Sequence, residues 1–157
     1  MGEICHAGPN NMVSYWNKPG ETAEICHDGW IHSGDGGAWD EDGYVFILDR
    51  IKSMIISGGE NIFPAEIERT LGNHPAIAEV VVVGVPHPDW GEVVKAAVVR
   101  RPGRDLTADD VRAFVETQLA SYKKPRIVEF LDELPMTPTG KVNRKALSEA
   151  PLPDAVT

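Results

Sequence analysis

Two apolar segments separated by a short loop constrain the fold of this chain more than any other feature. Residues 78–86 read AEVVVVGVP, and residues 92–101 read EVVKAAVVRR. Valine is β-branched and favours strands, and both segments are far shorter than the roughly 20 apolar residues that a membrane span needs. The intervening PHPDWG contains two prolines and a glycine, which interrupt regular structure. We therefore predict two buried strands joined by a loop.

Helical signals flank these strands. A helix is predicted from Pro64, which suits a first turn, to Gly72, which can end it. Thr107 is a predicted N-cap, and the apolar residues after it recur at helical spacing. IKSMIISGG and RIVEFLDELP are further predicted strands, and RKALSEA is a predicted short helix. This order predicts an α+β domain, with a mixed sheet flanked by helices, at about 49–150.

The first part of the chain, 1–48, has a different texture. It is rich in Gly, Asn, Asp and Trp, and its apolar stretches are short: SYW (14–16), GWIHSGD (29–35) and GYVFILD (43–49). We predict short strands joined by tight turns and no helix in this segment, which is too short and polar to fold alone. The last residues, 151–157, are predicted to be a disordered tail.

Composition excludes several classes of partner. The net charge of the 157 residues is −9, which argues against a general nucleic-acid binder or a protein that binds anionic membranes. No membrane span and no signal peptide are visible, so we expect a cytoplasmic location. Small basic clusters at 123–126 and 141–145 suit a phosphate-bearing small molecule, although a solvated face is the better explanation of either cluster taken alone.

The two cysteines each precede a histidine, as Cys5-His6 and Cys26-His27. Two cysteines are too few for a disulfide scaffold. Adjacent residues of a strand point to opposite faces, so each Cys-His pair is a poor chelator of zinc. We predict reduced thiols beside surface histidines and no metal site.

A stiffened loop near the end of the chain carries a single lysine. Residues 135–145 read PMTPTGKVNRK, in which prolines and a glycine surround Lys141. Proline cannot donate a backbone hydrogen bond, and glycine adopts backbone angles that other residues avoid. Taken alone, this pattern is typical of a solvated surface loop.

Three motifs in sequence order resemble the closing motifs of the adenylate-forming superfamily. They are GWIHSGD, YVFILDRIKSMIISGGENIFPAEIE (44–68) and PMTPTGKVNRKAL (135–147). This superfamily includes acyl-CoA synthetases, luciferases and the adenylation domains of peptide synthetases. The resemblance implies that 1–48 is the remnant of a large AMP-binding domain and that 49–150 is a small, mobile lid domain. The phosphate loop and acyl pocket of the family have no counterpart here, so we expect the C-terminal part of a longer enzyme, inactive by itself.

The resemblance also implies the chemistry. The family joins a carboxylic acid to ATP, giving an acyl adenylate and pyrophosphate, and then transfers the acyl group to the thiol of coenzyme A. Lys141 matches the lysine that bridges the carboxylate and the α-phosphate, and Asp35 and Arg50 match two contacts of the adenylate ribose. Lys52 falls at the family's hinge. Mg is expected in the parent enzyme, bound outside this chain.

Two further groups of residues match the side of the lid that receives coenzyme A. A pantetheine channel is implied at Ser57, Gly58, Gly59 and Glu60. Contacts to the coenzyme A nucleotide are implied at Trp90, Tyr122, Lys124 and Arg126. Packing or solvation is the alternative for each of these last four residues.

We therefore predict part of an ATP-dependent carboxylate–CoA ligase acting on a fatty acid or a similar acid. Its partners would be the missing N-terminal domain and a protein acetyltransferase, because Pro135 to Lys141 fits the PxxxxGK pattern acetylated in several acyl-CoA synthetases. The alternatives are a peptide-synthetase adenylation domain, a luciferase-like enzyme and an isolated, non-catalytic lid.

Overall fold

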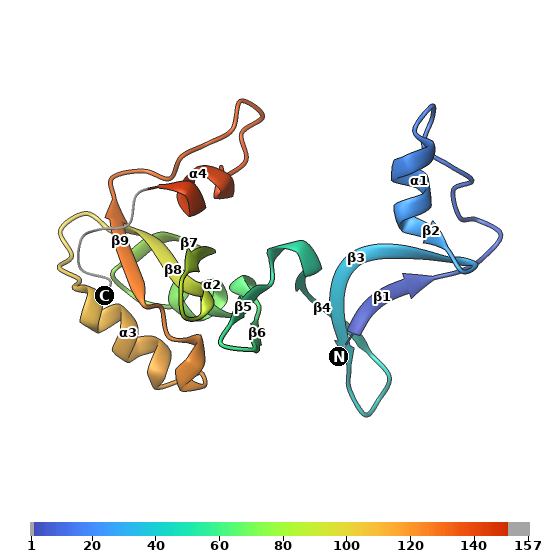
Figure 1. Ribbon diagram of the computed structural model, residues 1–157. Coiled ribbons are helices and arrows are strands. Elements are labelled where there is room, and N and C mark those ends of the chain that lie inside the picture. The colour runs from blue at the N-terminus through green and yellow to red at the C-terminus, as the bar shows by residue number, and fades with distance from the viewer. Residues whose placement is uncertain (1, 151–157) are drawn as a thin grey trace. The chain divides into compact units, whose positions relative to one another are not determined.

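The computed structural model describes residues 2–150, so the predicted tail at 151–157 lies outside the described residues. Contacts between residues divide the chain into two compact units (Figure 1). Unit 1 ends at Lys52 and unit 2 begins at Ser53.

Unit 1 is an antiparallel sheet built around one long strand. The strands are β1 (Gly2–His6), β2 (Cys26–His27), β3 (Trp30–Trp39) and β4 (Val45–Arg50). All three other strands pair with β3, in the order β1-β3-β2 with β4 also on β3. The predicted strands at 29–35 and 43–49 correspond to β3 and β4.

Two expectations for unit 1 are wrong. Residues 14–16 form no strand, and a helix that we did not predict, α1 (Pro19–Ile25), follows them. The helix has only seven residues and buries none, so it has no apolar stripe to reveal it. Its signals are local: Pro19 stands at the first helical position, and the ammonium of Lys18 lies 2.7 Å from Glu21 one turn on.

Unit 2 has a mixed sheet, which confirms the predicted α+β architecture. Its strands are β5 (Ile55–Ser57), β6 (Glu60–Ile62), β7 (Ile77–His87), β8 (Gly91–Arg100) and β9 (Ile127–Leu131). The order is β6-β5-β8-β7, and β9 pairs with β8 as the one parallel partner among the described strands of this sheet. The two predicted Val-rich strands are β7 and β8, paired along ten residues of β7.

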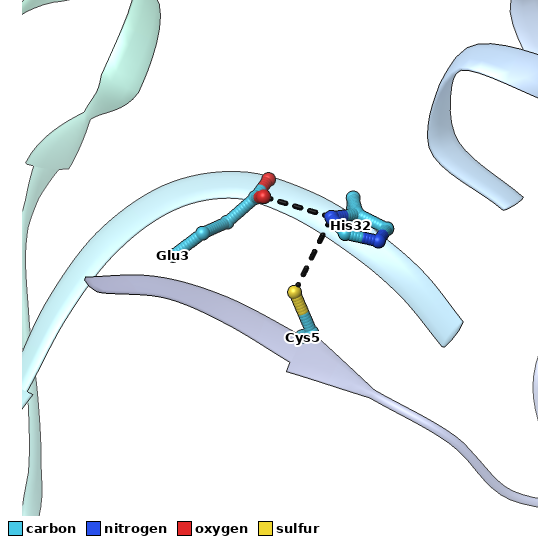
Figure 2. Close-up of side chains that lie close together, drawn as sticks. All are labelled: Glu3, Cys5 and His32. Carbon is cyan, nitrogen blue, oxygen red and sulfur yellow. Dashed lines mark hydrogen bonds and ion pairs between the residues drawn. The ribbon is translucent and has the colours of Figure 1, made fainter. Parts of the chain in front are cut away.

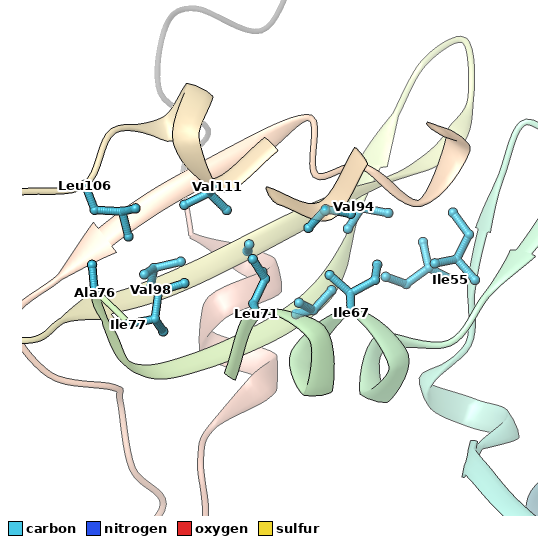
Figure 3. Close-up of a cluster of buried hydrophobic side chains, with 13 residues drawn as sticks. Ile55, Ile67, Leu71, Ala76, Ile77, Val94, Val98, Leu106 and Val111 are labelled. Carbon is cyan, nitrogen blue, oxygen red and sulfur yellow. The ribbon is translucent and has the colours of Figure 1, made fainter. Parts of the chain in front are cut away.

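Both faces of the β7–β8 pair are buried. Val82, Val94 and Val98 face a cluster completed by α2 (Pro64–Gly72) and α3 (Ala108–Glu116), the two predicted helices (Figure 3). Val81 and Val93 point to the opposite face, where Leu147 of α4 (Arg144–Glu149) covers them. Alternate residues of a strand face opposite sides, so a strand buried on both sides needs apolar residues at every position.

Unit 1, by contrast, has no apolar core among its described residues. Every buried hydrophobic side chain in the described chain belongs to unit 2, beginning with Ile55. The exposed large hydrophobic side chains of unit 1 are Met12, Val13, Tyr15, Trp16, Trp30, Trp39, Tyr44, Val45, Phe46 and Ile47. An apolar surface of this kind is typical of an interface with another polypeptide. Within residues 2–150, no helix is both long and apolar enough to cross a membrane.

The start of α3 provides a test of this fold. Thr107 Oγ1 accepts a hydrogen bond from the Asp110 N–H at 3.2 Å, and Asp110 Oδ2 accepts one from the Thr107 N–H at 2.9 Å. Replacing Thr107 with Ala should lower the free energy of unfolding by about 1 kcal/mol at neutral pH, because one helix N–H loses its acceptor. Urea denaturation followed by circular dichroism would measure the loss.

The same cap predicts a pH dependence. Hydrogen bonds from Thr107 lower the pKa of Asp110, so its carboxylate stabilises the fold above its unfolded pKa of about 3.9 and loses this effect as the pH falls through the folded value. Wild type should therefore be more stable than Asp110→Asn at pH 7, and the difference should shrink below about pH 4. Asp105→Asn, at an exposed carboxyl just before the cap, is the control; an equal pH-dependent loss in both variants would contradict the prediction.

Candidate functional site

The loop that carries Lys141 is a closed hairpin. Met136 and Val142 form an antiparallel bridge, and the Asn143 N–H donates to the Pro135 carbonyl at 2.7 Å. Lys141 lies near the tip and is exposed, and its ammonium has no hydrogen bond or ion pair within the described chain. The stiffness that the sequence predicts is therefore present as a hydrogen-bonded turn.

Threonine and glycine residues shape the tip of this hairpin. The Thr137 N–H donates to the Lys141 carbonyl at 2.6 Å, and Thr137 Oγ1 accepts from the Lys141 N–H at 3.1 Å. Gly140 has a φ of 78°, in the left-handed region that favours glycine, and its N–H donates to the Thr137 carbonyl. Both polar groups of the Lys141 backbone are thus held, and only its side chain is free to move.

Arg144 anchors the base of the hairpin to the outer edge of β7. Its Nη1 donates to the Val82 carbonyl at 2.8 Å, and its Nη2 lies 2.9 Å from Glu68. Glu68 in turn accepts from the Val82 N–H at 2.7 Å. The guanidinium and the carboxylate together satisfy both backbone groups of Val82 at an edge that would otherwise be unpaired.

A buried lysine holds the other side of α4. Lys95 of β8 is 0% exposed, and its ammonium donates to the Leu147 carbonyl at 3.0 Å and lies 2.9 Å from Glu129 of β9. A buried charge needs such partners, since leaving one unpaired costs several kcal/mol. The helix that follows Lys141 is therefore attached to the centre of the sheet.

Asp35 and Arg50, both predicted to contact the ribose, lie side by side in unit 1. They are opposite each other in the β3–β4 ladder, and Arg50 Nε is 2.8 Å from Asp35 Oδ1. Arg50 also donates to the Ser33 carbonyl at 3.0 Å. Lys52 follows in a short 3-10 turn, Ile51–Ser53, and is the last residue of unit 1.

The SGGE segment is a two-residue hairpin that joins β5 to β6, a strand that we did not predict. Ser57 pairs with Glu60, and Gly58 and Gly59 have φ values of 59° and 87°. Positive φ at both central positions is the mark of the tight turns that fit the twist of a β-hairpin. The Gly58 N–H donates to the Trp90 carbonyl at 3.0 Å, so the hairpin tip is fixed to the β7–β8 turn.

A cavity of about 590 Å³ opens beside this hairpin, entirely within unit 2. Seven residues that we predicted for the coenzyme A side line it: Ser57, Gly58, Glu60, Trp90, Tyr122, Lys124 and Arg126. Gly59 is not part of the lining. Four lining residues were missed: His87, Arg112, Ser121 and Pro125. Lys141 does not line the cavity, so the hairpin with the lysine and the cavity are separate features of unit 2.

Trp90, which lines the cavity, is held in place on two sides. The guanidinium carbon of Arg126 lies 4.2 Å from the centroid of the Trp90 ring, a cation–π distance. A Cβ at Gly58 would lie 2.6 Å from Cε3 of the same ring, so only glycine fits there. The ring is thus packed against backbone and covered by a cation rather than standing free.

Other side chains set the charge of the cavity. Arg112 donates to the carbonyls of Pro125 and Arg126, at 3.2 and 3.0 Å, and so fixes the direction of this segment from α3. Lys124 lies 3.1 Å from Glu116, which partly neutralises it. Arg112 also lies 2.8 Å from Asp109, and Glu60 adds one carboxylate to the lining. Arg126 has no carboxylate partner among the described residues and is the cation best suited to a phosphate-bearing ligand.

The structure also forms a cluster that the sequence did not predict, from Glu3, Cys5 and His32 (Figure 2). His32 Nδ1 lies 2.8 Å from Glu3 Oε2 and 3.4 Å from Cys5 Sγ. Hydrogen bonds from His32 and from the Gly34 N–H lower the pKa of Glu3, and burial together with Glu3 raises the pKa of the Cys5 thiol. Cys5 therefore associates with a histidine on the neighbouring strand, a pairing that only the β1–β3 register reveals.

Comparisons with known proteins agree with this arrangement. Residues 66–141 match the model of the AMP-binding enzyme C-terminal domain. The chain is 52% identical to the fatty acid–[acyl-carrier-protein] ligase ScoC of Streptomyces coeruleorubidus over 149 residues, which are 95% of this chain and 29% of that protein. It is also 52% identical to a feruloyl-CoA synthase of an Amycolatopsis species, over 90% of this chain and 29% of that protein.

A solved structure shows the same fold. The o-succinylbenzoate CoA synthetase (MenE) of Bacillus subtilis, in complex with its acyl-adenylate intermediate, superposes with a TM-score of 0.85 at 39% identity, covering 96% of this chain and 31% of that chain. The chain thus spans about 29% of the length of the curated relatives that it matches. It belongs to the adenylate-forming superfamily, and its second unit contains the AMP-binding enzyme C-terminal domain.

Proposed function

We propose that this chain supplies the lid and the adjoining strands of an ATP-dependent carboxylate–CoA ligase. The observation that carries the proposal is Lys141, whose ammonium has no partner in the described chain and stands on a hairpin held at both ends. An unpaired cation on a rigid support can stabilise a negative charge that is held by another domain. The large AMP-binding domain, whose remnant we assign to 1–48, would cover the apolar surface of unit 1.

In the first half-reaction a carboxylate attacks the α-phosphate of ATP. Both reactants are anions, so a cation between them lowers the barrier as charge develops on the phosphorus. Lys141 would supply that cation. The paired Asp35 and Arg50 would hold the adenylate ribose, because the carboxylate offers two acceptor oxygens to a diol and Arg50 fixes its orientation. Mg would bind outside this chain.

In the second half-reaction the thiol of coenzyme A attacks the adenylate. The cavity beside the Ser57–Glu60 hairpin is the proposed entrance, because glycine backbone allows the thin pantetheine arm to pass close by. Arg126, Arg112 and Lys124 would face the phosphates of the nucleotide. Arg126 already covers a face of Trp90, so the adenine would stack on Tyr122 or take the place of Arg126.

Lys141 and the cavity lie at separate places on unit 2. This supports a lid that turns one of these places toward the active site in the first half-reaction and the other in the second. Lys52 is exposed and stands at the boundary between the units, as a hinge requires. We propose that rotation at Lys52 exchanges the lysine hairpin for the cavity between the half-reactions. A cytoplasmic location and an acetyltransferase acting on Lys141 stay predictions.

A carrier protein is the second candidate acceptor, since ScoC is named as an acyl-carrier-protein ligase. Carrier proteins present the same pantetheine arm without the coenzyme A nucleotide. The cations of the cavity wall favour coenzyme A. Its nucleotide has phosphates that the pantetheine arm of a carrier protein lacks, and these phosphates could bind Arg126.

Lys141→Ala in the longer ligase should slow adenylation by a factor on the order of hundreds, because the transition state loses its positive charge. Pyrophosphate release from ATP and the acid would measure this step. Thioester formation from preformed acyl adenylate should stay within about twofold of wild type. Lys145→Ala, at an exposed lysine beside the hairpin, is the matched control, and an equal effect of both variants would disprove the role of Lys141. The 157-residue chain alone should release no pyrophosphate.

Arg126→Ala tests the identity of the acceptor. It should weaken the use of coenzyme A by about tenfold, the loss expected for one charge-assisted contact, while phosphopantetheine, which lacks the nucleotide, is used as before. The ratio of kcat/KM for the two thiols would measure this. An equal loss for both thiols would instead place Arg126 at the pantetheine arm and favour a carrier-protein acceptor.

Gly58→Ala and Gly59→Ala form a matched pair. Both positions have positive φ, so both substitutions strain the turn, but only a Cβ at Gly58 collides with Trp90. Gly58→Ala should raise the KM for coenzyme A by at least about fivefold more than Gly59→Ala, with adenylation unaffected in both. Equal KM values would show that the position of Trp90 does not matter for the acceptor.

A further inference from the structure

One face of the unit 1 sheet brings together three chemically different donor groups. Glu3 and Cys5 come from β1 and His32 from β3, and Figure 2 shows the three side chains converging between the strands. One ligand atom from each lies within 4.8 Å of the other two. None of these residues has a part in the ligase chemistry proposed above.

We propose that Glu3, Cys5 and His32 bind a borderline-soft divalent cation of the zinc class, through Oε2, Sγ and Nδ1. Thiolate sulfur, imidazole nitrogen and carboxylate oxygen are the three donor types that zinc takes from proteins. Hard cations such as Mg²⁺ and Ca²⁺ prefer oxygen ligands alone, so the cysteine and histidine discriminate against them. Three protein ligands leave a fourth tetrahedral position for water.

The spacing of the donors fits this cation. Ligand atoms around tetrahedral zinc stand about 3.3–3.6 Å apart, given bond lengths of about 2.0–2.3 Å. The separation of 3.4 Å between Cys5 Sγ and His32 Nδ1 falls within this range. The hydrogen-bonded pair of His32 and Glu3, at 2.8 Å, would open by about half an ångström as the cation replaces the shared proton.

Neighbouring groups hold the donors in place. Cys5 and His32 are direct partners in the β1–β3 ladder, so both side chains leave the same face of the sheet. The Gly34 N–H donates to Glu3 Oε1 at 3.0 Å, which orients the carboxylate and leaves Oε2 toward the cluster. The His27 ring stacks on His32 with a centroid distance of 3.7 Å and fixes its plane. Such outer contacts are what orient metal ligands.

Unit 1 also has a physical use for a cation. It buries no large hydrophobic side chain among its described residues, so within this unit β1 is held to β3 by the strand ladder and by side-chain contacts such as this cluster. Only one of its two cysteines can belong to the cluster. Cys26 is paired with Ile31, the residue before His32, and therefore lies on the opposite face of the sheet from His32. A cation at this position would link β1 to β3, the strand on which the whole sheet depends.

Cys26 therefore provides an internal control in wild-type protein. The full 157-residue chain would be treated with iodoacetamide with and without zinc chloride, and the alkylation rate of each cysteine followed by mass spectrometry. Zinc should slow the alkylation of Cys5 by at least about tenfold and leave Cys26 within about twofold, because a thiolate bound to a metal is a poor nucleophile. Equal rates with and without zinc at Cys5, or equal protection of both cysteines, would overturn the proposal.

Cobalt substitution tests the ligand set directly. Cobalt chloride added to wild type should give a thiolate-to-cobalt charge-transfer absorption at one equivalent, absent in Cys5→Ser and weakened in His32→Gln. Cys26→Ser and His6→Gln are the matched controls and should keep the absorption. A band that survives in Cys5→Ser would refute the site. If Cys5→Ser fails to fold by circular dichroism, the alkylation comparison in wild type still decides.

Discussion

The ladder between β7 and β8 is the constraint on which the rest of unit 2 depends. The two strands pair from Ile77–Arg100 to His87–Gly91, and β8 also accepts β5 and the parallel β9. Because both faces are buried, successive residues of β7 pack against different helices: Val82 faces α2, and Val81 faces α4. The turn between the two strands carries Trp90. Lys95, in the middle of β8, donates a hydrogen bond to α4, the helix that follows Lys141. Both features of the proposed lid are therefore positioned from one pair of strands.

Patterns that depend on neighbours in sequence predicted most of this fold. The Val-rich runs gave β7 and β8, Pro64 and Gly72 bounded α2, and Thr107 is the N-cap of α3. Helix α1 and strand β6 were missed because neither is long enough for an apolar pattern to stand out: α1 has seven residues and buries none of them, and β6 has three residues. In β6 the signal was the Gly58-Gly59 pair, which is compatible with a hairpin as well as with a bulge or a turn before a helix.

The family motifs predicted most residues of the candidate site, but they could not predict how these residues interact. No local pattern says that Arg126 covers Trp90, that Glu116 pairs with Lys124, or that Arg112 reaches the carbonyls behind them. These contacts join different elements, at separations of 8 residues or more, which is beyond the reach of a local pattern. The same limit applies to the cysteines: both are free and each adjoins an exposed histidine, as predicted, but only the strand register shows that Cys5 lies opposite His32. Periodicity places a side chain on a face, and only tertiary structure supplies the residue opposite it.

The closed hairpin around Lys141 has a mechanical consequence. Its backbone is held by Thr137, Gly140 and Asn143, and its base by Arg144, so no loop remains that could stretch or fold to correct a poor approach. The reach of the ammonium is then the length of one lysine side chain, about 6 Å. The position of the ammonium in the active site is therefore set by the angle at the hinge. An error of a few degrees at the hinge would displace the hairpin tip in full, because the hairpin cannot bend to correct it.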